Sequence, residues 1–150
     1  MRFTLLSDEA LQAWGSALSK QLGAPALVFL NGNLGAGKTT LVRGFLRGLG
    51  HVGAVKSPTY TIVESYQFAE LECFHFDLYR MADPEELEAM GIRDYIHEKA
   101  ICMIEWPELG EGVLPEPDII IDIKILEVGR QLQLRVINSQ HQYILDQLDI

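Results

Sequence analysis

Apolar residues in the first half of the chain alternate between short continuous runs and helical spacing. Residues 3–6 form a run that predicts a strand, and Ser7 then has the side chain of a helix N-cap, followed by Asp8 and Glu9. The predicted helix ends at Gly23. Its apolar face would consist of Ala10, Leu11, Trp14, Leu18 and Leu22.

A second strand and helix follow directly. Residues 26–30 are continuously apolar and predict a buried strand, whereas residues 40–47 return to helical spacing and are closed by Gly48 and Gly50. Farther on, residues 59–66 and 71–79 are rich in β-branched and aromatic side chains, which predicts a hairpin.

The last part of the chain contains one more helix-strand unit and a second hairpin. Residues 83–91 begin with a proline and acids that favour a helix start, and residues 100–104 are typical of a strand covered on both faces. Residues 119–125 and 131–136, joined by a turn, predict an antiparallel hairpin at an edge of the sheet. The tail, residues 140–150, predicts a short helix.

This alternation predicts an α/β fold in which a central, mostly parallel sheet is flanked by helices, with antiparallel hairpins at the edge. A chain of 150 residues is long enough for one domain with its own core, so residues 1–150 form a single predicted domain. No apolar run approaches the ~20 residues of a membrane helix, and the acidic start does not resemble a secretory signal. Cys73 and Cys102 lie in apolar runs and read as buried free thiols, which favours a cytoplasmic protein.

The net charge of −9 argues against independent binding of nucleic acid. Binding that is driven by phosphate neutralisation needs clustered basic side chains, whereas the seven arginines and five lysines are scattered along the sequence. A partner should therefore hold any nucleic acid on which this protein acts.

One segment carries a specific chemical signal. Residues 32–39 match Gly-x-x-x-x-Gly-Lys-[Ser/Thr] without a gap and lie between the predicted strand 26–30 and the predicted helix 40–47. This strand-loop-helix order is the context of a phosphate-binding P-loop, in which backbone N–H groups and a helix N-terminus face an anion. Lys38 would reach the β- and γ-phosphates of a nucleotide, and the Thr39 hydroxyl would bind Mg²⁺. The candidate ATP-binding residues here are Gly32, Asn33, Leu34, Gly35, Ala36, Gly37, Lys38, Thr39 and Thr40.

Two acids end strand-like runs and are candidate catalytic residues together with Lys38. Glu105 closes the apolar run 100–104, where a P-loop ATPase places a carboxylate that serves the Mg²⁺ site. Asp77 shares one strand face with His75 and would bind Mg²⁺, orient the attacking water or pair with a neighbouring arginine. A strand-end or turn-capping role remains open for both acids, and a structural role is favoured for His75.

A third segment, residues 56–61, lies where P-loop proteins carry a switch that senses the γ-phosphate. Its hydroxyl groups include Ser57 and Thr59, although a Ser-Pro-Thr turn is common and weakly informative alone.

Together these motifs resemble the TsaE family of bacterial ATPases, which act in making threonylcarbamoyladenosine beside the anticodon of certain tRNAs. The resemblance covers the P-loop and residues 56–61, 75–80 and 104–108, and extends over nearly the whole chain. It implies that the protein binds ATP with Mg²⁺, hydrolyses it slowly when alone, and works with the partner proteins TsaD and TsaB.

The resemblance also implies roles for particular residues. Thr39 and Glu105 would serve the metal, and Thr59 and Asp77 would contact nucleotide or metal. Ser7 and Asp8, at the start of the first helix, would lie by the nucleotide base. One departure is Asn33, where the family usually has aspartate. The side chain at this position is not needed for the backbone phosphate cradle, so nucleotide binding is expected to survive the change.

Two other classes of P-loop protein are alternatives. A small-molecule kinase usually needs a lid with extra arginines to clamp its second substrate, and no arginine-rich segment is present. A regulatory GTPase would need a guanine-reading Asn-Lys-x-Asp motif, which the sequence does not contain.

Overall fold

A seven-stranded sheet runs through the computed structural model, which describes residues 1–148. The strands are β1 (Arg2–Leu5), β2 (Ala26–Asn31), β3 (Val63–Gln67), β4 (Glu72–Asp77), β5 (Ala100–Glu105), β6 (Ile119–Ile125) and β7 (Arg130–Val136). Their order is β1-β7-β6-β2-β5-β4-β3. The neighbours β6, β2, β5 and β4 are parallel, and the pairs outside them are antiparallel. The predicted fold class is confirmed.

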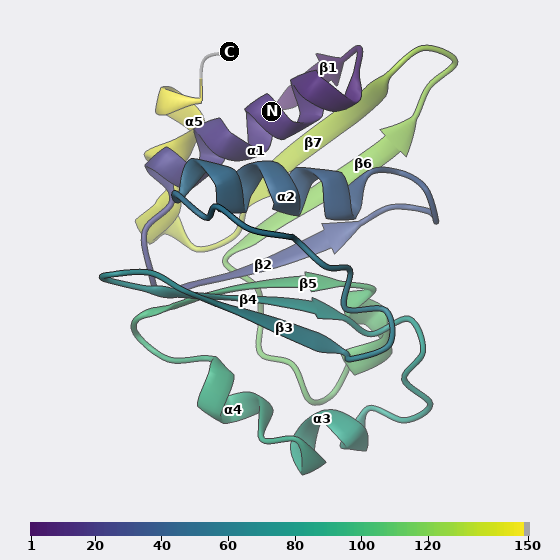
Figure 1. The fold of residues 1–150 in the computed structure, drawn as a ribbon, viewed down its shortest axis with the longest axis vertical. Helices are drawn as coiled ribbons and strands as arrows, with labels where there is room; N and C mark the ends of the chain where they lie inside the picture. Colours follow the sequence, from purple (N-terminus) through teal and green to yellow (C-terminus); the bar gives the residue numbers. More distant parts are fainter. Residues whose placement is uncertain (149–150) are drawn as a thin grey trace.

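Helices cover both faces of this sheet (Figure 1). The helices are α1 (Asp8–Gln21), α2 (Lys38–Gly48), α3 (Glu85–Ala89), α4 (Ile92–Tyr95) and α5 (Ile144–Gln147), with short 3-10 turns η1 (Pro107–Gly110) and η2 (Ser139–His141). In Figure 1, α1, α2 and α5 lie on one side of the sheet and α3 and α4 lie on the other. The Ser7 side chain accepts the Ala10 N–H at 3.0 Å, so it caps α1 as predicted.

The core follows the alternation of the strands. In β2, Val28 and Leu30 join the apolar cluster beneath α1 and α2, whereas Leu27 joins the cluster on the opposite face. The central strand β5 is buried at every position, as expected for a strand that is covered on both faces. Cys73 and Cys102 are buried free thiols, and burial raises the pKa of Cys102 to about 12.

The first hairpin begins later than predicted. Residues 59–62 were expected to be extended, but β3 starts at Val63, because the backbone N–H of Ile62 donates to Pro58 O at 2.8 Å and closes a turn. Ile62 has φ 70°, a value that a β-branched residue rarely adopts. The segment 49–62 therefore has no regular secondary structure, and it connects α2 to the opposite edge of the sheet.

Two further expectations change at the ends of the chain. The hairpin of β6 and β7 does not form an edge, because β1 pairs with β7 and β6 pairs with β2. The predicted tail helix is divided into η2 and α5, and its last two positions lie outside the described residues. Within residues 1–148 no helix is long and apolar enough to cross a bilayer.

Candidate functional site

The P-loop connects the carboxyl end of β2 to the first residue of α2. Gly37 has φ 106° immediately before α2, a left-handed conformation that glycine adopts without steric cost. A Cβ at Gly37 would also lie 2.5 Å from the Leu11 side chain of α1. The conformation of Gly37 and its close approach to α1 therefore both constrain the loop. The first turn of α2 then presents its free N–H groups at the N-terminal end of the helix, next to the loop.

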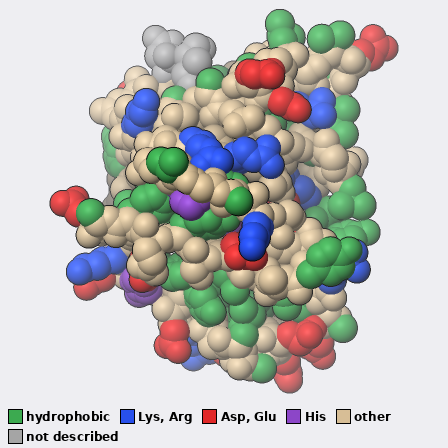
Figure 2. Space-filling model, in the orientation of Figure 1, with side chains coloured by type: hydrophobic (Ala, Val, Ile, Leu, Met, Phe, Trp, Pro, Cys, Tyr) green, Lys and Arg blue, Asp and Glu red, His purple; other side chains and the backbone are tan. Residues whose placement is uncertain are grey.

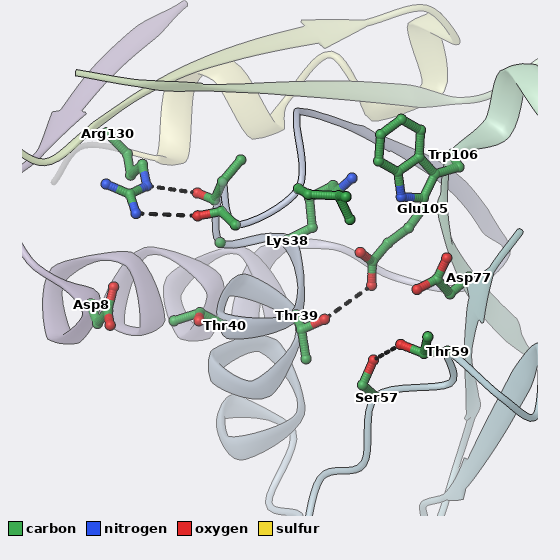
Figure 3. Close-up of a pocket in the computed structure, with 14 residues that line it drawn as sticks. Asp8, Lys38, Thr39, Thr40, Ser57, Thr59, Asp77, Glu105, Trp106 and Arg130 are labelled. Atoms are coloured by element: carbon green, nitrogen blue, oxygen red, sulfur yellow. Dashed lines mark hydrogen bonds between the residues drawn. The ribbon is translucent and has the colours of Figure 1, made fainter. Parts of the chain in front are cut away.

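A hydroxyl and a carboxylate meet beside this loop. The Thr39 Oγ1 donates to Glu105 Oε2 at 3.3 Å, although the two residues are 66 positions apart (Figure 3). Glu105 and Asp77 end the neighbouring parallel strands β5 and β4 and are register partners. The alignment of the strand ends thus brings both predicted acids to the P-loop side of the sheet.

His75 holds the carboxylate of Glu105. Its Nε2 lies 2.5 Å from Glu105 Oε2, and the imidazole is fully buried. The sequence favoured a structural role for His75, and this contact makes it a positioning residue for Glu105. Strand alternation offered the only signal, since it places His75 and Asp77 on one face of β4.

Lys38 is held by two groups of its own site. Its Nζ donates to Gly32 O at 2.6 Å and lies 3.8 Å from the ring centroid of Trp106. Burial lowers the pKa of Lys38, and the negative charges of Glu105, Asp77 and Glu108 partly offset this effect. An entering phosphate would therefore compete with one backbone carbonyl and one aromatic face for the ammonium group.

Asp77 lies in a similarly desolvated position. Burial raises the pKa of Asp77, the hydrogen bond from the Tyr79 backbone N–H at 2.9 Å opposes the rise, and the nearby charge of Glu105 adds to it. Only Oδ1 accepts the Tyr79 N–H, so the other oxygen remains available to the cavity. Asp77 is thus a carboxylate of raised basicity at the cavity wall.

The segment 49–62 contributes two hydroxyl groups. Ser57 Oγ and Thr59 Oγ1 lie 2.7 Å apart, and both side chains line the cavity (Figure 3).

The described chain has positive φ at two non-glycine residues, Ile62 and Trp106, and each adjoins a site segment. Strained backbone of this kind is found where a fold holds functional groups in place.

Arg130 also lines the cavity, and sequence reasoning assigned it only to a turn. Its Nε donates to Ala36 O at 2.8 Å and one terminal nitrogen donates to Gly35 O at 3.3 Å (Figure 3). The preceding Gly129 has φ 79°, and a Cβ there would lie 2.3 Å from Leu5 O. The β6-β7 turn thus fits closely against β1 and directs an arginine onto the P-loop, a relation that only tertiary structure reveals.

These residues surround one cavity of about 300 Å³. Of the predicted residues it is lined by Asp8, Leu34, Gly35, Ala36, Gly37, Lys38, Thr39, Thr40, Thr59, Asp77 and Glu105. Ser7 does not line it. Gly32 and Asn33 line a neighbouring hollow that includes Asp122.

The donor set suits a hard cation that is bound mainly by phosphate and water. Residues 1–148 contain no cluster of three or more His, Cys, Asp or Glu side chains that could form a complete metal cage. Mg²⁺ usually keeps several waters and takes one or two protein ligands besides phosphates. The Thr39 hydroxyl and the Glu105 carboxylate, which meet at 3.3 Å, have the donor chemistry of such a pair.

Comparison with known proteins gives a consistent result. A family model described as "Threonylcarbamoyl adenosine biosynthesis protein TsaE" matches residues 5–133. A Haemophilus influenzae protein named tRNA threonylcarbamoyladenosine biosynthesis protein TsaE is 60% identical over 108 residues, 72% of this chain and 68% of the relative. A Bacillus subtilis protein of the same name is 38% identical over 120 residues, 79% of this chain and 75% of the relative. The crystal structure of Bacillus subtilis YdiB superposes with a TM-score of 0.84 at 28% identity, covering 99% of this chain and 93% of that one.

Proposed function

The chain belongs to the TsaE family, and we propose that it binds and hydrolyses Mg-ATP during the synthesis of threonylcarbamoyladenosine on tRNA. The family name supplies the pathway. The ATPase activity and its metal dependence are inferences from the chemistry of the site.

The contact between Thr39 and Glu105 carries this proposal. A P-loop alone supports nucleotide binding, but hydrolysis also needs groups that act where charge develops in the transition state. The 3.3 Å contact joins the P-loop to the buried carboxylate of Glu105 at the end of its strand. The buried imidazole of His75 forms a hydrogen bond with the same carboxylate and fixes its position. Phosphate binding and metal chemistry thus share one wall of the cavity.

The chain's own groups have separable tasks. The N–H groups of the P-loop and of the first turn of α2 would bind the phosphate oxygens, and Lys38 would leave Gly32 O and Trp106 to neutralise the terminal phosphates. Mg²⁺, when bound by Thr39 and Glu105, would neutralise charge on the phosphates.

Asp77 would orient the attacking water. Asp77 lines the cavity, only its Oδ1 accepts the Tyr79 N–H, and burial raises its pKa, so it accepts a hydrogen bond or proton more readily than an ordinary aspartate. Because Asp77 and Glu105 are register partners on adjacent strands, the water and the metal site would be held by one rigid sheet edge.

We further propose that TsaD and TsaB are the protein partners, as the family resemblance implies, and that they hold the tRNA. The isolated chain would then hydrolyse ATP slowly and reach full turnover only in their presence. The net charge of −9 supports this division, since it disfavours independent capture of a polyanion.

The test measures phosphate release from ATP by the purified chain, with Mg²⁺ and after its removal by a chelator, with and without TsaB, TsaD and tRNA. We expect slow, Mg²⁺-dependent hydrolysis that rises when the partners are added. Absence of both ATP binding and partner-stimulated hydrolysis contradicts the proposal. Recovery of the phosphoryl group on a small metabolite, instead of as inorganic phosphate, would favour a kinase.

A further inference from the structure

Charge is divided unequally along this acidic chain. Residues 10–63 contain five lysines and arginines and no aspartate or glutamate, whereas nineteen of the 21 acidic residues follow position 63. Residues 10–63 are thus positive because they lack acids, not because basic residues are concentrated there. A positive segment in a protein of net charge −9 indicates a surface with its own electrostatic partner.

The fold gathers part of this segment on one surface. Arg43 and Arg47 are four residues apart on α2 and therefore on the same helical face. Arg47 donates to His51 O at 3.0 Å, which holds the start of the segment 49–62 to the end of α2. Figure 2 shows Lys and Arg side chains over α2 in the middle of this view, with acidic side chains mostly toward the rim.

Lys56 belongs to the same surface. The ring of Tyr66 from β3 packs edge-on against His51, whose backbone oxygen accepts from Arg47, with the ring centroids 4.9 Å apart. Burial raises the pKa of Tyr66, and the Lys56 backbone and the charge of Arg47 oppose this rise, so both lie near the Tyr66 hydroxyl. We call Arg43, Arg47 and Lys56 the basic face. None of them takes part in the salt bridges found in residues 1–148, so their charges are not neutralised within the described chain.

Exposed apolar side chains lie in the same segment of the chain. Val52 is 89% exposed and Tyr60 is 82% exposed. Arg80 stacks on the Tyr60 ring at 4.4 Å and donates to its hydroxyl at 3.3 Å, so these two contacts orient the exposed ring. Arginine, tyrosine and exposed aliphatic side chains together are typical of protein interfaces.

We propose that the basic face docks on an acidic surface of a protein partner. This inference rests on the proposed function and adds the surface through which the partner binds. A nucleic acid is the weaker occupant, because three cations neutralise few phosphates and the surrounding acidic surface repels a backbone. An acidic protein surface needs only a few opposed charges, and it would also cover the exposed Val52, which directly follows the His51 bound by Arg47.

The position of the basic face connects it to the nucleotide site. Helix α2 begins with Lys38 and Thr39, and the segment 49–62 carries Ser57 and Thr59, all of which line the cavity. A partner on this surface would therefore contact both elements that surround a bound phosphate. The affinity of this surface for the partner would therefore depend on whether a nucleotide is bound in the cavity.

The experiment measures binding of the full chain to the purified TsaB–TsaD complex at about 50 and 200 mM salt. We expect the wild-type affinity to fall with salt, and Arg43→Glu/Arg47→Glu to weaken binding about ten- to a hundredfold at low salt with little remaining salt dependence. Arg43→Gln/Arg47→Gln should have a smaller effect in the same direction, and it replaces the glutamate variant if thermal melting shows that variant to be unfolded.

Arg2→Glu/Arg93→Glu is the matched control, since it changes net charge equally at exposed positions outside the basic face. ATP affinity should be unchanged in all three variants. If the wild type binds the complex and the basic-face variants bind like the control, the inference is overturned while the proposed function stands. If the wild type does not bind the complex, the proposed partners are wrong and the inference falls with them. Tight binding of tRNA alone, near the ~10⁻⁸ M of dedicated nucleic-acid binders, that is lost in the basic-face variants would identify RNA as the occupant instead.

Discussion

The P-loop and the carboxylate pair line one cavity, but the chain builds them differently. The P-loop is one continuous segment whose shape depends on local glycine geometry and the start of α2. The carboxylates come from two strands, and Glu105 meets Thr39 across 66 positions and His75 across 30. The P-loop depends on a local motif, whereas the carboxylates depend on correct strand register.

This difference separates binding from hydrolysis. The P-loop offers backbone donors and one lysine, which under the proposed function would contact the phosphates already in the ground state. Asp77 is buried beside Glu105, its register partner, so the ionised form of Asp77 carries an electrostatic cost before ligand binds, which the nearby His75 and Lys38 offset only in part. Variants on the two sides should consequently affect different steps.

The largest effect is expected for Glu105→Ala. Hydrolysis should fall about 10²–10³-fold, because the carboxylate acts where charge develops, while ATP affinity changes only a few-fold. Single-turnover rates and calorimetric titration with Mg-ATP separate these quantities. Glu111→Ala, at an exposed acid on the same connection, is the control. Equal single-turnover rates in Glu105→Ala and wild type would show that this carboxylate is structural.

Lys38→Ala should affect the first step instead. Loss of a charge-assisted contact costs about 1.5–3 kcal/mol, roughly ten- to a hundredfold in affinity or rate. Calorimetric titration with Mg-ATP measures the affinity, and the exposed Lys124→Ala serves as control. If both the affinity for Mg-ATP and the turnover are unchanged, residues 32–39 are not a phosphate-binding loop.

Arg130→Gln sharpens the comparison, because it tests a long-range support of the P-loop. Loss of its bonds to Ala36 O and Gly35 O should raise the KM for ATP about three- to tenfold and change kcat less, since the loop is loosened while the carboxylates stay in place. Arg130→Lys should recover part of the affinity. A fall in kcat at constant KM would place Arg130 on the hydrolytic side instead.

The smallest effect concerns Asp77 and acidity. Because burial raises the folded-state pKa of Asp77 above its ordinary 3.8, the folded protein holds this proton more tightly than the unfolded chain. The ionised side chain therefore destabilises the fold at neutral pH, and this penalty disappears as pH falls below the ordinary value.

Asp77→Asn, which can still accept the Tyr79 N–H, should raise the melting temperature at pH 7 by a few degrees while slowing hydrolysis. The difference in melting temperature should shrink as both proteins are acidified. A variant that is less stable than wild type at pH 7 would contradict the assigned cost of the buried charge.

Sequence patterns predicted the elements that rest on local signals. The Ser7 cap, the strand-loop-helix of the P-loop and the buried strand β5 were all found as expected. The predicted start of β3 was wrong. The turn at Pro58–Ile62 depends on a positive φ at Ile62, a conformation that the sequence does not predict for an isoleucine. The prediction that the second hairpin lies at the sheet edge was wrong as well. Its inner position depends on the pairing of β1 with β7, which joins distant parts of the chain and has no local sequence signal.

The sequence by itself determined the P-loop, since its motif is eight contiguous residues, and it identified both acids at their strand ends. Tertiary structure alone decided that Glu105 meets Thr39, that His75 holds Glu105, and that Arg130 reaches the P-loop. It also gathered part of the positive segment onto α2 and the segment beside it. The physical reason is range: glycine conformation and helix capping act over a few residues, whereas these contacts depend on strand order and register.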